Sequence, residues 1–438
     1  MNLYKNNEFS KLAILGGSPV RSDPLPTYNM IGAEEKKAVM DVLDSGELSG
    51  FIASDGKEFW GGKAVLALEA AFKKKFSVGY AVAVNSATSG LHCALYASGI
   101  SPGDEVIVPP YTMSASATTV LFSGGVPIFC DIDADSFCID PAKVEGLINS
   151  RTKAIVAVNL FGQPAALKKL RAISDKFNLI LIEDNSQAPA AQHHGAYAAT
   201  IGHMGVFSFN RHKTMQCGEG GVVVTNDSDF ALRMAMLRNH GECIADSQDF
   251  ENISNTVGLN YRMTEMEAAV ALVQLQKLDS LNAKRIKLAD EISSNLNSLP
   301  GFQPPYIEPG NTHVYYFYAI KFNAEEVGLS REIFCKAVEA EGFNARAGYL
   351  KPLYLEPHYQ KKICFGTSGF PFTANSRNDE IVYSKGICPV VERLADSELI
   401  ITNIIYPPLT TNDMQKFVEA CEKVVKNKDA LNNAFSEG

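Results

Sequence analysis

One lysine of the sequence lies between two short apolar segments. The lysine is Lys213; residues 205–209 (GVFSF) precede it, and a glycine-rich turn at 218–221 and a β-branched run at 222–225 follow it. An amine held in such a place can form a Schiff base with a carbonyl compound, provided that its surroundings lower its pKa. An ordinary loop lysine also fits this position, so Lys213 by itself leaves both interpretations open.

An acidic side chain ends another apolar run. Asp184 closes the run LILIED at 179–184. In an open α/β sheet, ligands bind beyond the carboxyl ends of the strands. An aspartate there can keep a heterocyclic nitrogen protonated, which turns a pyridine ring into an electron sink. A cap for the following helix is the alternative role for this residue.

Two groups of small or hydroxylated residues can bind a phosphate. Ala87 and Thr88 begin a predicted helix, whose N–H groups and dipole favour an anion. The simpler interpretation is a helix cap at Thr88 or Ser89. Ser208 lies five residues before Lys213 at the end of a predicted strand, where its hydroxyl can reach the same phosphate.

Taken together, these residues meet the needs of pyridoxal 5'-phosphate (PLP). This cofactor requires a phosphate site, an acid for its ring nitrogen and a lysine that forms a Schiff base. The sequence has no GxGxxG motif after its first predicted strand and no GxxxxGK[ST] loop, which disfavours dinucleotide-binding and P-loop folds.

The elements that must hold these residues form a repeating pattern. Short runs that are apolar on both faces alternate with helical patterns or turns, which is typical of a mostly parallel sheet between two layers of helices. The predicted fold class is therefore α/β. The predicted strands are 80–86, 105–110, 127–133, 154–162, 179–184, 205–210 and 221–226.

The remaining segments predict a second, smaller domain. A long helical pattern at 264–299 ends at Pro300 and links the two parts. We expect an N-terminal segment at 1–45 that packs on the small domain, a large PLP-binding domain at 46–299, and a small α+β domain at 300–438. The other predicted elements are helices at 34–46, 331–343 and 412–427 and a strand at 314–322.

Composition excludes several classes of protein. The chain has 438 residues, 46% of them hydrophobic, and a net charge of −9, which argues against a nucleic-acid partner. Its nine cysteines include no CxxC pair, which indicates reduced thiols and neither a disulfide framework nor a zinc site, so no bound metal is expected. No signal peptide and no membrane-spanning run is evident. We therefore expect a cytoplasmic protein.

The chain resembles the DegT/DnrJ/EryC1/StrS family of sugar aminotransferases. The resemblance extends from residues 12–26 (LAILGGSPVRSDPLP) to 406–414 (YPPLTTNDM), and its most specific element is the spacing of Ser208, Lys213 and the GEGG turn at 218–221. The resemblance implies the aspartate-aminotransferase-like (type I) PLP fold. It also implies PLP as the cofactor and a homodimer whose two active sites are shared between the subunits.

The family likeness assigns roles to individual residues. Lys213 would form the Schiff base with the cofactor and move the proton between substrate and cofactor, while Asp184 would pair with the pyridine nitrogen. Gln187 would contact the ring hydroxyl. The other cofactor contacts would come from Ala87, Thr88, Ser208 and Asn260, the last of them reaching the neighbouring subunit's cofactor phosphate.

The chain departs from the family pattern beside the cofactor ring. Met113 stands where an aromatic ring usually stacks, and either its thioether or Tyr111 would pack there. The residues implied for the substrate pocket are Tyr111, His313, Arg346 and Tyr349. Arg346 could bind a carboxylate or phosphate, or it could form a surface salt bridge.

These implications predict a specific reaction. L-Glutamate or L-glutamine would donate an amino group, and a keto-sugar, either nucleotide-linked or a free keto-octulosonate-type sugar acid, would accept it, for amino-sugar, lipopolysaccharide or surface-glycan biosynthesis. A PLP-dependent sugar dehydratase is the first alternative, disfavoured because Lys213 is retained, and a cyclitol- or aminobenzoate-forming relative is the second. A non-catalytic PLP-fold binding protein is a third alternative, against which the Lys213/Asp184 pair argues.

Overall fold

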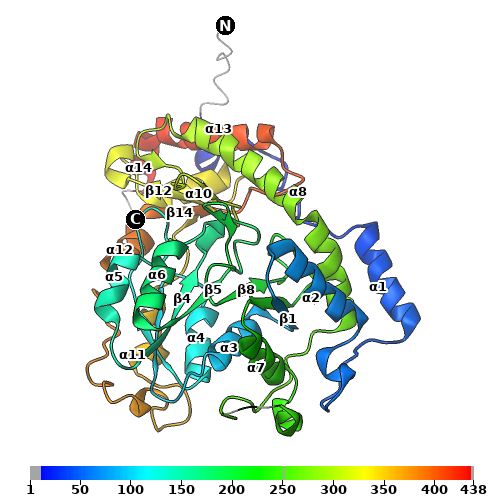
Figure 1. Ribbon diagram of the computed structural model, residues 1–438. Coiled ribbons are helices and arrows are strands. Elements are labelled where there is room, and N and C mark those ends of the chain that lie inside the picture. Colours follow the sequence, from blue (N-terminus) through cyan, green and yellow to red (C-terminus); the bar gives the residue numbers. More distant parts are fainter. Residues whose placement is uncertain (1–10, 249, 251, 436–438) are drawn as a thin grey trace.

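The computed structural model describes residues 11–248, 250 and 252–435 (Figure 1). A seven-stranded sheet lies at its centre, in the order β1-β9-β8-β5-β4-β2-β3. Strands β8, β5, β4, β2 and β3 are parallel neighbours, whereas β9 runs antiparallel to both β1 and β8. The strands are β1 (Tyr80–Val84), β2 (Glu105–Val108), β3 (Val126–Phe129), β4 (Thr152–Val158), β5 (Ile180–Asp184), β8 (Met204–Ser208) and β9 (Gly221–Thr225).

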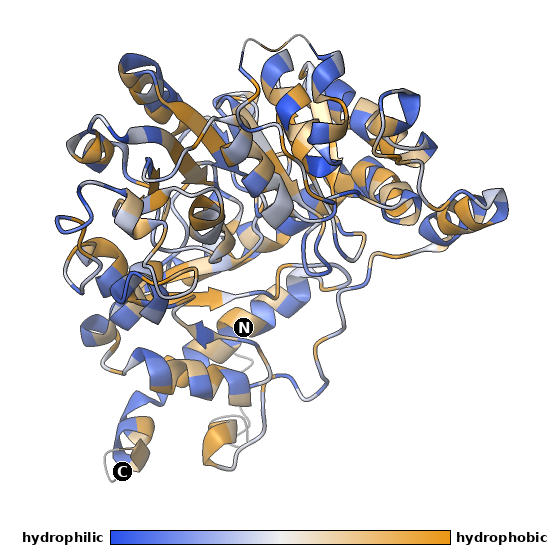
Figure 2. Ribbon diagram, turned by 90° about the horizontal axis from the view of Figure 1, so that it is seen from below, coloured by the Kyte–Doolittle hydropathy of each residue, from blue (hydrophilic) through white to orange (hydrophobic). Residues whose placement is uncertain are grey.

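Both faces of this sheet are buried. Along β1, Val82 and Val84 pack into one hydrophobic cluster while Ala81 and Ala83 pack into another, because successive side chains of a strand point to opposite faces. Figure 2 shows the result: the surface helices carry both hydrophilic and hydrophobic residues, and the strands are mostly hydrophobic. Each run predicted as a strand contains a strand, and the α/β prediction is confirmed.

Helices connect the strands and cover the sheet. Helix α2 packs on β1, α3 on β8 and β9, and α6 on β4 and β5. The helices up to the end of the large domain are α1 (Ala33–Ser45), α2 (Lys63–Phe76), α3 (Ala87–Ala97), α4 (Ala115–Phe122), α5 (Pro141–Val144), α6 (Leu167–Phe177), α7 (Ser228–Arg238) and α8 (Glu265–Leu296).

Helix α8 joins two hydrophobic cores. It starts at a capping box in which Thr264 and Glu267 satisfy each other's backbone N–H groups. Its first half contributes Leu278 to the core under the large sheet, and its second half contributes Ile292 to the core of the small domain. The helix predicted at 264–299 is thus present, with its two ends in different surroundings.

The small domain is built on a four-stranded antiparallel sheet, β10-β12-β14-β13. Helices α10 and α13 pack against each other and the C-terminal half of α8. The elements are β10 (Phe302–Gln303), β12 (Tyr318–Phe322), β13 (Arg346–Ala347), β14 (Leu399–Thr402), α9 (Ala324–Val327), α10 (Arg331–Ala340), α13 (Thr411–Lys426) and α14 (Lys428–Phe435).

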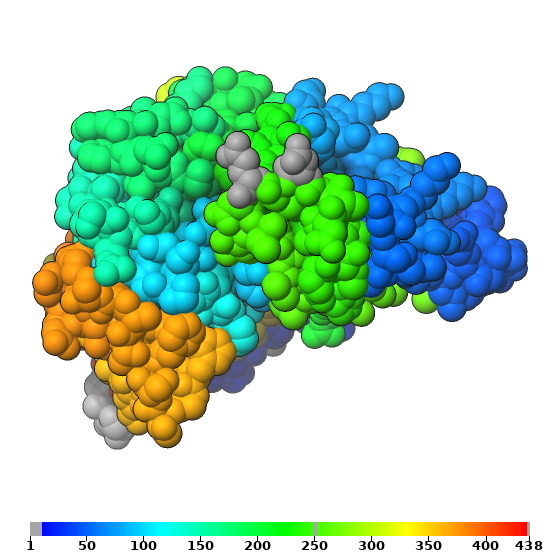
Figure 3. All heavy atoms as spheres, turned by 60° about the horizontal axis from the view of Figure 1, so that its bottom comes forward, coloured from blue at the N-terminus to red at the C-terminus, as the bar shows by residue number. Residues whose placement is uncertain are grey.

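Two segments pack against a domain that is distant from them in the sequence. Leu12 belongs to the core of the small domain, whereas α1 lies along α8. Residues 353–394 leave the small domain and bury Tyr354, Phe372 and Tyr383 in the core of the large domain; this segment is orange in Figure 3. It contains α11 (Pro357–Gln360) and α12 (Pro389–Arg393). The division into domains at residues 45 and 299 stays a prediction.

A third, three-stranded sheet lies where the two domains meet. It has the order β11-β6-β7, formed by β6 (Gln192–His193), β7 (Ala196–Tyr197) and β11 (Asn311–Thr312). The strands pair antiparallel, so β11, which precedes the small-domain sheet, is tied to a hairpin of the large domain. In the part of the chain that the structure describes, no helix combines the length and apolar character needed to cross a membrane.

Candidate active site

The residues singled out in the sequence gather at one edge of the central sheet. Asp184 is the last residue of β5 and Ser208 the last of β8, and these strands are parallel neighbours. Strand β1 also ends at this edge, since β1 and β8 both run opposite to β9. Helix α3 starts there with Ala87, and β9 starts there with Gly221.

The glycine-rich turn allows the backbone segments to approach closely. Gly221 pairs with Ser208, and a Cβ atom on Gly221 would lie 2.9 Å from the backbone nitrogen of Ala87. A side chain at this position would therefore push α3 away from Ser208. In this way the turn brings Ser208 and the start of α3 together, as a shared phosphate site requires.

The N-terminus of α3 is capped by a residue that the sequence did not single out. Ser86 accepts a hydrogen bond from the backbone N–H of Ser89, at 3.0 Å, so the cap is neither Thr88 nor Ser89. The Thr88 side chain is exposed, and its hydroxyl has no partner among the described residues. Thr88 is thus free to bind an anion together with the N–H groups of the first turn.

The amine of Lys213 has no hydrogen-bond or ion-pair partner among the residues that the structure describes. Its Nζ lies 4.4 Å from the centroid of the Tyr316 ring. Burial lowers the pKa of Lys213 to about 8, although the negative charge of Asp184 acts in the opposite direction. About a fifth of the amine is therefore neutral at about pH 7.4, far more than for an ordinary lysine, and this fraction can attack a carbonyl.

The Asp184 carboxylate is held in place by two hydrogen bonds. It is 5% exposed, and its Oδ2 accepts a hydrogen bond of 2.7 Å from the Ser116 hydroxyl. Its Oδ1 accepts from the backbone N–H of Ser186 at 3.1 Å. No helix follows directly, so the alternative role of Asp184 as a helix cap is wrong. Its neighbour Glu183 instead accepts backbone N–H groups of the turn at 199–202.

Gln187 connects this edge to two tyrosines. Its Oε1 accepts the N–H of Phe161 at 2.8 Å, and its Nε2 donates to the Tyr349 hydroxyl at 3.2 Å. The Tyr111 hydroxyl accepts the N–H of Tyr349 at 3.0 Å, while the two rings pack edge to face. Tyr111 is only 1% exposed, so Tyr349 covers it. The proposed contact of Gln187 with the cofactor hydroxyl stays a prediction.

Other predicted site residues lie in contrasting surroundings. Met113 is 53% exposed, so of the two candidates for stacking on the cofactor it is the accessible one. Asn260 is exposed, as expected of a residue that reaches another subunit. His313 is buried, with its Nδ1 accepting the N–H of Tyr315. Arg346 is exposed and forms no salt bridge within the described residues, and its role in binding a carboxylate or phosphate stays a prediction.

Two residues near the site were missed in the sequence. Ser116 orients Asp184 from the first turn of α4, and Tyr316 packs its ring on the Lys213 amine. A hydroxyl residue shortly after the predicted strand at 105–110 was the available signal for Ser116. Tyr316 lay in the aromatic run at 314–322, which indicated only a strand.

The polar groups at this edge of the sheet match the chemical groups of PLP. A phosphate matches the open N-terminus of α3 and the hydroxyls of Thr88 and Ser208, and a protonated ring nitrogen matches the Asp184 carboxylate. The unpartnered amine of Lys213 matches the aldehyde.

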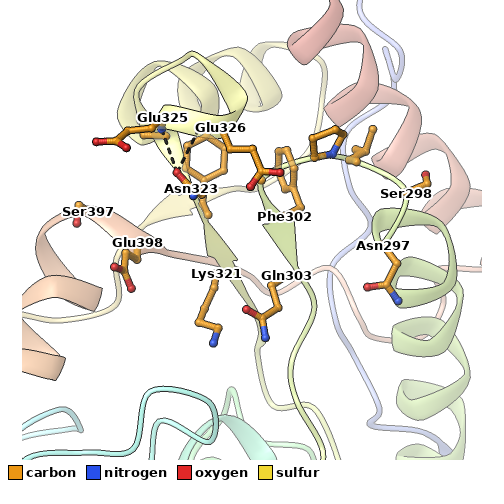
Figure 4. Close-up of a pocket in the computed structure, with 15 residues that line it drawn as sticks. Asn297, Ser298, Phe302, Gln303, Lys321, Asn323, Glu325, Glu326, Ser397 and Glu398 are labelled. Atoms are coloured by element: carbon orange, nitrogen blue, oxygen red, sulfur yellow. Dashed lines mark hydrogen bonds between the residues drawn. The ribbon is translucent and has the colours of Figure 1, made fainter.

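A separate polar hollow of about 900 Å³ on the small domain, shown in Figure 4, contains none of these residues. It is lined in part by Lys321, Glu326 and Glu398 and is not part of this site.

Comparison with known proteins gives a consistent result. A sequence model of the DegT/DnrJ/EryC1/StrS aminotransferase family matches residues 30–417. The chain is 32% identical to an L-glutamine:2-deoxy-scyllo-inosose aminotransferase of Streptomyces kanamyceticus, over 96% of this chain and 98% of that protein. It is 36% identical to a GDP-perosamine synthase of Caulobacter vibrioides, over 68% and 79% of the two chains. Among solved structures, S. venezuelae DesV in complex with a ketimine intermediate superposes with a TM-score of 0.75 at 31% identity, over 90% and 95% of the two chains.

Proposed function

The chain belongs to the DegT/DnrJ/EryC1/StrS aminotransferase family, and from this premise we propose that it transfers an amino group from L-glutamate or L-glutamine to the ketone of a sugar. It is a PLP-dependent aminotransferase with the type I fold. The observation that carries the proposal is the unpartnered Lys213 amine, with a pKa of about 8, at the sheet edge that also holds Asp184.

The bound cofactor supplies an aldehyde that condenses with amines and a ring that accepts an electron pair. In the proposal, Thr88, Ser208 and the first turn of α3 hold its phosphate. Asp184, oriented by Ser116, would hold a proton on the ring nitrogen. Met113, the accessible side chain at this edge, packs on the ring face.

Lys213 then acts as the proton carrier. Its amine would take the proton from the donor carbon as a general base. In the second half-reaction the same amine delivers a proton to the carbon of the acceptor. The Tyr316 ring, 4.4 Å from Nζ, covers the amine on one side and excludes water from it. Tyr349 and Arg346 are the proposed contacts to the substrates.

A cyclitol ketone is a second candidate acceptor. It is supported by the relative that acts on 2-deoxy-scyllo-inosose, which matches this chain over nearly the whole length of both. Both candidates present a ketone on a polyhydroxylated six-membered ring. Products of the sugar reaction would serve amino-sugar or surface-glycan biosynthesis, including lipopolysaccharide.

We also propose a homodimer that shares its active sites. Several large apolar side chains are exposed on neighbouring segments: Ile52 (48%), Trp60 (39%), Val257 (64%) and Leu259 (44%). Asn239 ties these segments together by donating to the carbonyl oxygens of Ile52 and Phe59. Burying this surface against a second copy would remove apolar area from water and place Asn260, the next residue, at the partner's cofactor.

A half-reaction assay tests the donor and the acceptor separately. L-Glutamate or L-glutamine should convert the PLP form of the purified protein to the pyridoxamine form, with loss of the Schiff-base absorption. The pyridoxamine form is then offered nucleotide-linked keto-sugars, free keto-sugar acids and a scyllo-inosose. Recovery of the absorption with one of the sugars supports the proposal. Recovery only with the inosose would select the cyclitol candidate, and no conversion by either donor would contradict both.

The pH dependence of cofactor loading tests the role of the Lys213 amine. Only the neutral amine attacks the aldehyde, so the loading rate of the cofactor-free protein should rise about tenfold per pH unit below the Lys213 pKa and level off above it. With the pKa at about 8, the midpoint should lie near pH 8. A midpoint near pH 10.5, the ordinary value for lysine, would contradict the lowered pKa.

A further inference from the structure

A cluster of possible metal ligands lies in and beside the three-stranded sheet. His193 and His194 come from the hairpin of β6 and β7, and Glu308 comes from the loop before β11. One ring nitrogen of each histidine and one carboxylate oxygen of Glu308 all lie within 4.8 Å of one another. We propose that these three residues bind a divalent transition-metal ion, for which Zn²⁺ is the best match.

The hairpin turn directs two consecutive histidines to the same place. Successive residues of a strand normally point to opposite faces. His194 and Gly195, however, form the two-residue turn between β6 and β7 and have φ values of 48° and 82°. The chain therefore leaves the strand geometry at His194, and the two imidazole rings lie with their centroids 4.5 Å apart.

His193 provides the buried part of the cluster. The residue is 3% exposed, and its Nδ1 has no hydrogen-bond partner in the part of the chain that the structure describes. A buried polar atom without a partner is unfavourable, and a metal ion would satisfy it. The other ring nitrogen, Nε2, accepts a long hydrogen bond of 3.4 Å from the N–H of Lys168. Ligation through Nδ1 moves the ring proton to Nε2 and gives up only this long contact.

The other two ligands are accessible and already oriented. Nε2 of His194 lies 3.8 Å from Oε1 of Glu308, and the two side chains are 36% and 42% exposed. Gly310 leaves room for the ring, because a Cβ there would lie 2.8 Å from Nδ1 of His194. Asn311 donates to Glu308 and accepts the backbone N–H of His194. Such outer contacts orient the ligands in known metal sites.

The donor set and its spacing match zinc. Two imidazoles and one carboxylate form a donor set known from zinc sites, and tetrahedral bonds of about 2.0–2.1 Å place neighbouring ligand atoms about 3.3 Å apart. A modest inward movement of the two exposed side chains achieves this spacing. Three protein ligands leave one position for water. The ion would fasten the hairpin to the segment that leads through β11 to His313 and Tyr316.

A second pair in the chain serves as the matched control. Nδ1 of His240 lies 3.8 Å from Oε1 of Glu242, and these side chains are 38% and 47% exposed. The distance and exposure resemble those of His194 and Glu308. No third ligand accompanies this pair among the described residues. If a surface histidine–carboxylate pair were enough to hold zinc, both pairs would do so.

The test measures zinc directly on the PLP-loaded protein. The protein is treated with a chelator, dialysed against buffered Zn²⁺ and analysed for metal content, and its melting temperature is compared with and without Zn²⁺. We expect about one zinc per chain and a higher melting temperature with zinc. His194→Ala and Glu308→Gln change half-exposed residues and should keep the fold, while each should weaken zinc binding by at least about tenfold. His240→Ala should bind zinc as the unchanged protein does.

Two results would overturn the proposal. One is no zinc retained by the unchanged protein. The other is equal zinc content and an equal shift of the melting temperature in His194→Ala and the unchanged protein, which would place the metal elsewhere. Neither readout depends on aminotransferase activity, so the metal site is tested separately from the proposed function.

Discussion

Two lysines withdrawn from solvent, one in each domain, have opposite surroundings. Lys423 of the small domain is 9% exposed and donates to Oε2 of Glu341 at 2.8 Å and to the carbonyl oxygen of Ser18 at 2.7 Å. Glu341 also accepts the N–H groups of Ala13 and Val20. Lys213 has no such partner among the described residues, and its pKa falls to about 8.

The difference separates a structural cation from a reactive amine. A buried ion pair that is fully hydrogen-bonded holds its segments together, and removal of one partner leaves an uncompensated charge. An amine that is desolvated without a partner loses its proton more easily and becomes a nucleophile. The comparison predicts that replacing Lys213 lowers activity and that replacing Lys423 lowers stability.

The largest effect is expected for Lys213→Ala. Loss of the proton carrier should lower kcat by about 1,000-fold or more, because general acid–base catalysis alone contributes up to about 10⁴-fold. The melting temperature of the cofactor-free protein should stay equal or rise, since the substitution removes a poorly compensated charge. Steady-state kinetics and thermal unfolding check the two halves of this prediction. A marked loss of stability with activity retained would show that Lys213 is a structural cation and not the reactive amine.

Lys423→Ala should have the opposite effect. Leaving Glu341 buried without its partner should destabilise the small domain by about 3–5 kcal/mol. Denaturant unfolding measures this loss, and kcat per folded molecule should not change. Lys426→Ala is the matched control, because its ion pair with Glu422 is solvent-exposed and should contribute less than about 1 kcal/mol. Equal stability of the two variants would contradict a structural role for Lys423.

Asp184→Asn should reduce activity while the fold persists. The amide keeps the size of the side chain but cannot hold the cofactor nitrogen protonated, so kcat should fall by about 100-fold. The pKa of Lys213 should also fall, because Asp184 raises it in the unchanged protein. The midpoint of cofactor loading should therefore move below that of the unchanged protein. A move to higher pH would show that Asp184 does not act on the amine.

The smallest effect is expected for Ser116→Ala. The hydroxyl donates to Asp184, and a hydrogen bond to a charged group contributes about 1.5–3 kcal/mol. Since the N–H of Ser186 still holds the other carboxylate oxygen, we expect the low end of this range, about a tenfold loss in kcat. Thr118→Ala, on the same helix, should leave kcat unchanged, because the Thr118 hydroxyl bonds the Ser114 carbonyl oxygen and not Asp184. Equal rates for the two variants would remove Ser116 from the site.

The sequence predicts the large sheet well, because its strands are continuous apolar runs that need burial on both faces. It also places Asp184 and Ser208 at one edge, since parallel strands end together. It could not predict that residues 353–394 return to the large domain, because their aromatic residues show no regular period. The pairing of Lys423 with Glu341, 82 residues away in the sequence, and the lack of a partner for Lys213 among the described residues depend on tertiary contacts, which the local sequence pattern does not reveal.

Chemical trapping of the cofactor tests the central claim most directly. Borohydride reduction of the PLP-loaded protein, followed by proteolysis and mass spectrometry, identifies the lysine that carries the cofactor. The expected result is a pyridoxyl-modified peptide containing Lys213 and an unmodified peptide containing Lys423. Modification of any other lysine in place of Lys213, or no modification at all, would contradict the assignment of Lys213 as the reactive amine.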